Sequence, residues 1–121
     1  MATHIREEFY GVEATADLSG FKYRAVTLNG TVAASLLRCA GILKTGCTSG
    51  GVAQTVMEGI TKAQFGGAVS TIGWPITITT SGWAAAASSG GLACGRALET
   101  CNSGDIAMVA VNFNMPFQSV I

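Results

Sequence analysis

The chain has 121 residues, 49% of them hydrophobic and 12% charged, and its seven Lys and Arg balance its seven Asp and Glu. This length suits one domain with a real hydrophobic core, and the apolar composition excludes intrinsic disorder. Without a basic tract the chain is not expected to bind nucleic acid, and without an apolar run of about 18 residues it is not expected to span a membrane. Its first residues are too acidic for a signal peptide, so we expect synthesis in the cytoplasm, with the four cysteines mainly reduced.

The charges are concentrated near the N-terminus, where the first 24 residues carry seven of the fourteen. Residues 1–20 are polar, with few large apolar side chains and no sustained hydrophobic periodicity. This pattern suits two structures equally: an arm that becomes ordered against a partner, or an edge strand packed on its own domain. With the first interpretation, the chain divides into an arm at 1–20, a β domain at 21–112 and a tail at 113–121.

After residue 20 the chain alternates between β-rich runs and turns rich in Gly, Ser and Asn. Residues 31–39 fit a helix as well as a strand, whereas the alanines at 84–87 are too few to nucleate a helix and are expected in a hairpin strand. Short strands at this spacing predict an all-β fold, a small barrel or sandwich. The expected strands are 23–28, 41–44, 52–57, 60–64, 76–80, 95–99 and 106–111.

Two of these runs have patterns that predict their place in the sheet. Residues 76–79 alternate Ile and Thr, as in a strand with one buried face. Residues 106–111 are apolar at every position, which predicts either a central strand or one packed against another subunit.

The sequence has little that would serve catalysis or metal binding. His4 is the single histidine and falls in the segment interpreted as an arm, so no Cys or Ser gains a fixed base from it. No Cys-x2-Cys spacing occurs among the four cysteines, which predicts buried small side chains more than zinc ligands or disulfides. We therefore expect no enzyme, no metal and no cofactor. The cysteines are Cys39, Cys47, Cys94 and Cys101.

Trp74 and Trp83 bracket the alternating strand and allow two interpretations. Exposed on one face, they would stack on sugars or on a partner protein, which would make the chain a carbohydrate- or surface-binding β module. Packed inward, they would cap the core.

The second half of the chain contains an ordered series of short segments rich in small residues: 56–63, 66–69, Gly73, 76–78, 81–82, 89–90, 95–99 and 103–109. This series resembles tailed-bacteriophage capsid decoration proteins, also called head cement proteins. The opening Phe9-Tyr10-Gly11-Val12 and the segment Cys39-Ala40-Gly41-Ile42-Leu43 are similar to that family as well, so the resemblance covers about residues 6 to 112. The four cysteines of this chain and the segment Ile72-Gly73-Trp74-Pro75 depart from the family pattern.

The resemblance implies a small β-barrel or β-tulip-like domain without enzymatic activity. It implies a structural protein of the virion, made in the host cytoplasm, that binds the outer surface of the head and cements neighbouring capsomers. The partners would be the major capsid protein and further copies of the chain, as a trimer or alternatively a dimer.

From this resemblance and the apolar pattern we predict two sets of contact residues. In the arm, Phe9, Tyr10 and Val12 would anchor the chain to the capsid, with Arg6, Glu7 and Glu8 setting the register. Deleting residues 2–18 would then leave a folded domain that no longer decorates heads. Self-association would use the last strand and the tail, through Ile106, Met108, Val109, Val111, Phe113 and Phe117.

Overall fold

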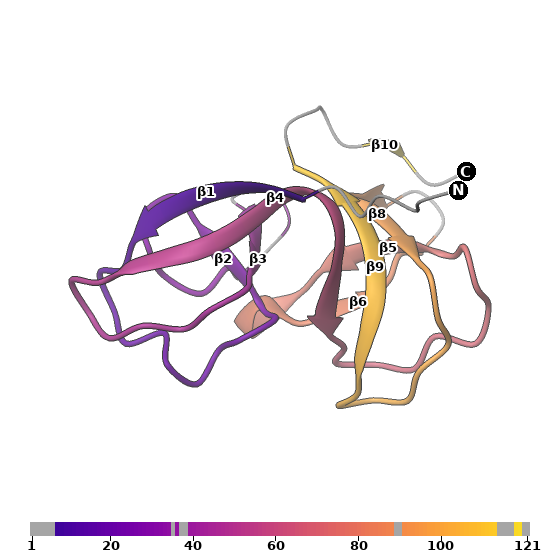
Figure 1. The fold of residues 1–121 in the computed structure, drawn as a ribbon. Coiled ribbons are helices and arrows are strands. Elements are labelled where there is room, and N and C mark those ends of the chain that lie inside the picture. The colour runs from indigo at the N-terminus through magenta and orange to yellow at the C-terminus, as the bar shows by residue number, and fades with distance from the viewer. Residues whose placement is uncertain (1–6, 35, 37–38, 89–90, 114–117, 120–121) are drawn as a thin grey trace, which may run out of the picture.

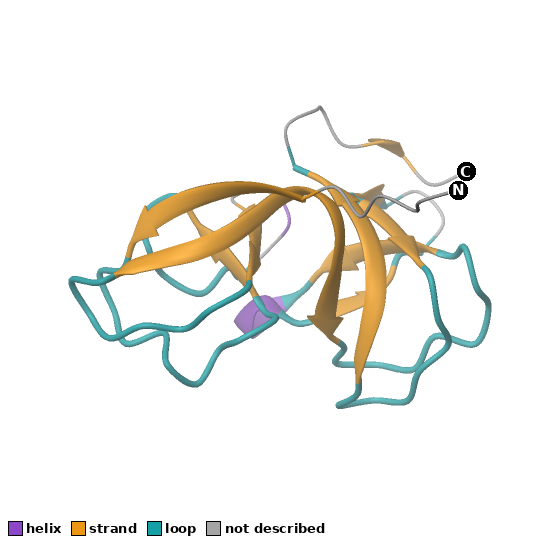
Figure 2. Ribbon diagram, in the orientation of Figure 1, coloured by secondary structure: helices purple, strands orange, loops and turns teal. Residues whose placement is uncertain are grey.

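The fold is all-β, as a computed structural model that describes residues 7–34, 36, 39–88, 91–113 and 118–119 shows (Figure 1). Strands dominate, and Figure 2 shows very little helix, including the short 3-10 turn η2 at Thr80–Gly82. No helix in the described part of the chain has the length and apolar character needed to cross a membrane. The strands are β1 Glu7–Glu13, β2 Ala25–Thr27, β3 Cys39–Leu43, β4 Val52–Gln64, β5 Pro75–Ile78, β6 Ala84–Ala86, β7 Leu92–Ala93, β8 Gly95–Ala97, β9 Ile106–Asn112 and β10 Gln118–Ser119.

Strand β4 is 13 residues long and belongs to two lobes of the molecule. Its first half pairs with β1 and β3, and its second half pairs with β9. Glu58 and Gly59 pair with both β1 and β9, so these two strands lie on opposite edges of β4. In Figure 1, β1, β2 and β3 surround the first half of β4 and form the first lobe with it, whereas β5, β6, β8 and β9 form the second lobe with its other half.

The second lobe is a small barrel that closes on itself. Its strands follow the order β4, β9, β8, β5 and β6. A bridge between Phe65 and Ala84 joins the last strand back to the end of β4, and the N–H of Gly66 donates to the Ala84 carbonyl at 2.9 Å. This closure leaves few unpaired edges in the lobe.

The first lobe is closed by a turn. The strands β2, β3, β4 and β1 lie in that order, and the N–H of Thr15 donates to the carbonyl of Gly30 at 3.1 Å. Gly30 has a φ of 81° and lies so close to the Glu13 carbonyl that a side chain there would overlap it. Only glycine combines this backbone conformation with this approach.

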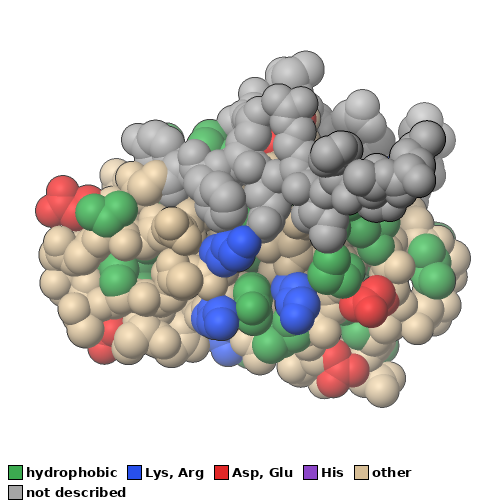
Figure 3. Space-filling view, in the orientation of Figure 1, with side chains coloured by type: hydrophobic (Ala, Val, Ile, Leu, Met, Phe, Trp, Pro, Cys, Tyr) green, Lys and Arg blue, Asp and Glu red, His purple; other side chains and the backbone are tan. Residues whose placement is uncertain are grey.

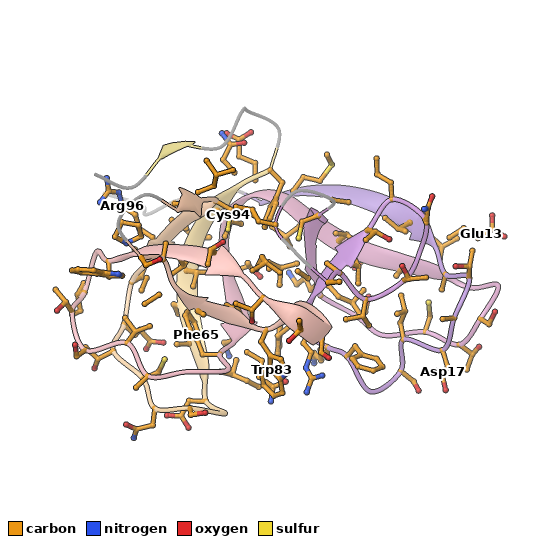
Figure 4. All side chains as sticks on the ribbon, turned by 180° about the vertical axis from the view of Figure 1, so that it is seen from behind. Glu13, Asp17, Phe65, Trp83, Cys94 and Arg96 are labelled. Atoms are coloured by element: carbon orange, nitrogen blue, oxygen red, sulfur yellow. The ribbon has the colours of Figure 1, made fainter. Side chains whose placement is uncertain are left out.

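Each lobe has its own hydrophobic core. Phe65 is fully buried in the second lobe, whose core also includes Val109 and Val111 of β9. The first lobe is filled around Leu18 and Leu43, both fully buried. Figure 4 shows Phe65 inside the second lobe, while Glu13 and Asp17 lie at the outer end of the first.

The all-β prediction is confirmed, with two revisions to its details. Residues 52–57 and 60–64 form a single strand, because Gly59 adopts a φ of 127° and bends β4 without ending its pairing. For the first residues, the edge-strand alternative is the one found, since Glu7–Glu13 pair with β4. The expectation that removal of residues 2–18 would leave a folded domain conflicts with this arrangement, because Val12 and Leu18 are buried in it.

Candidate interaction surfaces

The predicted capsid anchors lie on or before strand β1. Its register against β4 places Phe9 opposite Val56 and Tyr10 opposite Thr55. Val12 is 1% exposed, so its selection as an anchor was wrong: it packs inside the chain's own first lobe. The structure does not describe Arg6 or the side chains of Glu7, Glu8, Phe9 and Tyr10, so these predicted contacts lie outside the described part of the chain.

The predicted self-association strand is central in the sheet, with β4 on one side and β8 on the other. Val109 and Val111 alternate into the second core and are 0% and 4% exposed, so they cannot also bind a sister subunit as predicted. Ile106 and Met108 alternate to the outward face, where Ile106 is 48% exposed. Phe113 packs against the second core, and Phe117 lies outside the described residues.

The outward face of the second lobe combines apolar and basic side chains. Across it, Lys62 on β4 pairs with Met108 on β9, and Arg96 on β8 pairs with Ala110. Both cations are exposed, and Leu98, beside Met108, is 38% exposed. An apolar face with charges at its margin is typical of a protein contact surface.

The two tryptophans do not form a shared platform. Trp74 directly precedes β5, whereas Trp83 directly precedes β6 and its carbonyl accepts from the N–H of Thr79. The indoles therefore mark opposite ends of the β5–β6 hairpin, about 16 Å apart at the rise of a β-strand. Trp74 is 43% exposed and donates its Nε1–H to the Ala87 carbonyl at 3.0 Å, so the alternative of a sugar-binding indole pair finds no geometric support.

A cluster at the junction of the two lobes was missed by the sequence analysis. The Arg24 guanidinium lies 3.8 Å from the centre of the Trp83 ring and 5.2 Å from that of Phe21. Its Nε also donates to Oε1 of Gln64 at 3.2 Å. Arg24 thus joins a loop of the first lobe to both β4 and the β5–β6 hairpin.

Two lysines, Lys22 and Lys62, lie close to the position of Gln64 in the chain fold. The backbone N–H of Gln64 donates to the Tyr23 carbonyl at 2.9 Å, and the Lys22 ammonium lies 5.0 Å from the Tyr23 ring. Lys62 stands two residues before Gln64 on β4, and therefore on the same face of the strand. We call this set the junction patch: Phe21, Lys22, Tyr23, Arg24, Lys62 and Trp83.

The surface view agrees with this grouping. In Figure 3, Lys and Arg side chains gather in the middle of one face with hydrophobic side chains between them. In the same view, Asp and Glu side chains lie at the left end of the molecule and to the right of the Lys and Arg group. Aromatic and basic residues alternate at 21–24, and this alternation could have indicated the cluster from the sequence. Its contact with Trp83 is seen only in the folded structure.

The cysteines are free thiols in the structure. Burial raises the pKa of Cys39 and of Cys94 to about 12, and Cys94 also donates to the Ile76 carbonyl at 3.6 Å. Burial also raises the pKa of Cys101. Among the described residues, no three His, Cys, Asp or Glu side chains are grouped so as to hold a metal ion.

No protein-family model matches this sequence, and no curated protein matches it either. A solved structure with a similar fold is the head fiber gp8.5 N base of bacteriophage phi29, at a TM-score of 0.66 and 14% sequence identity. The similarity covers 89% of this chain and 96% of that chain. The fold is therefore similar to that of a phage head fiber protein, which confirms the resemblance to phage head proteins at the level of the fold.

Proposed function

We propose that this chain is a structural protein of a phage virion that binds the outer surface of the head and stabilises contacts between neighbouring capsomers. The observation that carries the proposal is the fold, which is similar over nearly its whole length to the base of a phage head fibre. A function in binding also suits the chain, because its outward surfaces combine exposed apolar groups with clustered cations.

The partner in this proposal is the major capsid protein. A subunit that is repeated over a closed shell needs only modest affinity at each position, since the contacts add up over the lattice. Residues Arg6, Glu7, Glu8, Phe9 and Tyr10 remain proposed contacts with the shell. Strand β1 is already paired with β4, so any such contact would extend from a strand that is fixed to the domain.

Self-association is the second part of the proposal. Ile106 and Met108 are on the outward face of β9, and they would bury against another copy in a trimer or a dimer. Sedimentation velocity at micromolar concentration should give an oligomer that Ile106→Glu converts to a monomer. A monomeric wild-type protein would remove this part of the proposal and leave head binding to be tested by itself.

The test of head binding mixes the purified protein with mature heads, with immature heads and with buffer alone. Imaging should reveal added density at regular positions on the outside of mature heads, and those heads should withstand heating better than undecorated ones. An unrelated β domain of similar size is the control for non-specific adsorption. Failure of the protein to sediment with either kind of head would contradict the proposed function.

A further inference from the structure

We propose that the junction patch is a docking site for a carboxylate-rich surface of a protein in the phage head. This inference rests on the proposed function and names the face that makes contact and the chemistry that it recognises. It is carried by the charge, the arrangement and the rigidity of the patch.

The patch brings three cations around one residue, Gln64. Arg24 is hydrogen-bonded to its side chain, Lys62 lies beside it on β4, and Lys22 is next to Tyr23, whose carbonyl accepts the Gln64 N–H. Such a concentration of positive charge attracts a negatively charged partner and orients it during encounter.

Three of the acids that the structure describes, Asp105, Glu13 and Asp17, are directed elsewhere. Asp105 follows Gly104, whose carbonyl accepts from the Gln64 side chain, but the Asp105 carboxylate accepts the N–H of Asn102 at 2.9 Å. Glu13 and Asp17 lie at the outer end of the first lobe, away from Trp83 (Figure 4). An acidic partner would therefore supply a charge that the patch does not receive from these acids.

The central cation of the patch is held in place before any partner arrives. Arg24 lies over Trp83, and Trp83 packs against Gly66, where an added Cβ would lie 3.0 Å from the Trp83 Cβ and 3.2 Å from Cγ of the indole. Among the described residues, only Nε of the guanidinium has a hydrogen-bond partner, so both terminal nitrogens can donate to one carboxylate. Preorganisation lowers the entropy that binding would cost.

Two other occupants fit less well. A nucleic acid would need open aromatic faces on which bases could stack, but Trp83 and Phe21 are faced by Arg24, and Tyr23 is faced by Lys22. A second copy related by a twofold axis through the patch would place these cations against their own counterparts. A carboxylate-bearing protein surface satisfies both the charge and the geometry.

The first experiment measures binding to mature heads at 50 and 150 mM NaCl. Lys22→Glu with Lys62→Glu, both at exposed positions, should weaken binding about tenfold at the lower salt, and wild-type binding should itself weaken as salt rises. Thr48→Glu with Ser49→Glu adds negative charge at exposed positions in the loop between β3 and β4, away from the patch, and should bind as the wild type does. Equal binding by the Lys22, Lys62 variant, or an equal loss in the Thr48, Ser49 variant, would overturn the inference.

A second experiment does not depend on heads. In a Trp74→Phe background, Trp83 is the single tryptophan and its emission reports on Arg24. A deca-glutamate peptide should change this emission in a saturable way, and the double charge reversal should abolish the change. No response to the peptide, or an equal response to oligo-dT of the same charge, would overturn the inference. Failure of the wild type to bind heads while the peptide response persists would contradict only the proposed function.

Discussion

Arg24 and Trp83 are 59 positions apart in the sequence, yet the guanidinium of one lies 3.8 Å from the ring centre of the other. The contact forms because β4 passes from the first lobe to the second, so that the loop before β2 meets the hairpin of β5 and β6. It gives the two lobes a direct link besides their shared strand.

Arg24→Ala should destabilise the protein by about 1–3 kcal/mol, because it removes a cation–π contact and a hydrogen bond to Gln64. Urea unfolding at pH 7 measures the change, and Trp83 emission should shift to longer wavelength in the folded variant. Arg96→Ala removes a cation bonded to the Gly73 carbonyl at an exposed position and is the matched control. Equal losses in the two variants would show that Arg24 does not link the lobes.

Gly95→Ala should prevent normal folding or cost at least about 2 kcal/mol. Gly95 lies between β5 and β9, and a side chain there would overlap the backbone carbonyl of Ala110. Gly67→Ala is the control, since an added methyl at Gly67 meets nothing within 4 Å. Thermal unfolding of both variants checks the difference, and a Gly95→Ala variant as stable as Gly67→Ala would refute this packing.

Thr55→Val should leave the stability unchanged or raise it by about 1 kcal/mol. The Thr55 hydroxyl is fully buried and has no hydrogen-bond partner among the described residues, and such a group carries a desolvation cost that a methyl group avoids. Thr55→Ser retains the hydroxyl and loses the methyl, so it should destabilise the fold. Chemical denaturation of the wild type and the two variants gives their order of stability. A destabilised Val variant would indicate that the Thr55 hydroxyl has a hydrogen-bond partner.

The stability should fall as the pH rises from about 9 toward 12. Burial raises the pKa of Cys39 and Cys94 from 9.0 to about 12, so the unfolded chain releases thiol protons in this interval while the folded chain retains them. The thiol contribution is therefore fully present below pH 9 and lost as the pH approaches 12.

Urea midpoints at pH 8 and 10.5 measure this dependence, and a Cys39→Ala, Cys94→Ala double variant should show a smaller decrease. Iodoacetamide at pH 8 should also modify these two thiols far more slowly in the folded protein than in urea. Rapid labelling of Cys94 in the folded state would contradict its burial.

Deletion of residues 2–18 should abolish the cooperative unfolding transition, since it removes strand β1 together with Val12 and Leu18. A milder test is Leu18→Ala, which should cost about 2–5 kcal/mol because Leu18 is fully buried. Leu28→Ala, at a position that is 64% exposed, is the control and should change little. A stable deletion variant would restore the view that these residues form a detachable arm.

Local sequence patterns were sufficient to predict most of the strands. The alternation of Ile and Thr at 76–79 predicted one buried face, and Ile76 and Ile78 are both buried in β5. The fully apolar run in β9 predicted a central strand, which it is, but could not indicate which side chains would face inward. Only the register against β4 and β8 determines that Val109 and Val111 are in the core.

Contacts between distant segments could not be predicted in this way. A glycine usually ends a strand in a sequence-based prediction, whereas Gly59 continues β4 through a positive φ because its neighbours remain paired. The junction patch is also a tertiary arrangement, in which Arg24 lies over the ring of Trp83. The alternation of aromatic and basic residues at 21–24 was visible, but its meaning came from tertiary contacts.

The double pairing of Glu58 and Gly59 has a consequence for engineering the chain. Glu7 at the start of β1 and Asn112 at the end of β9 pair with these two adjacent residues, so the eight-stranded sheet begins and ends at nearly the same place. A short linker could therefore join the ends, with new termini opened at the exposed Asn29 turn. Such a circular permutant would keep the pairing partners of β4 and could carry a fused passenger from the opposite end of the molecule.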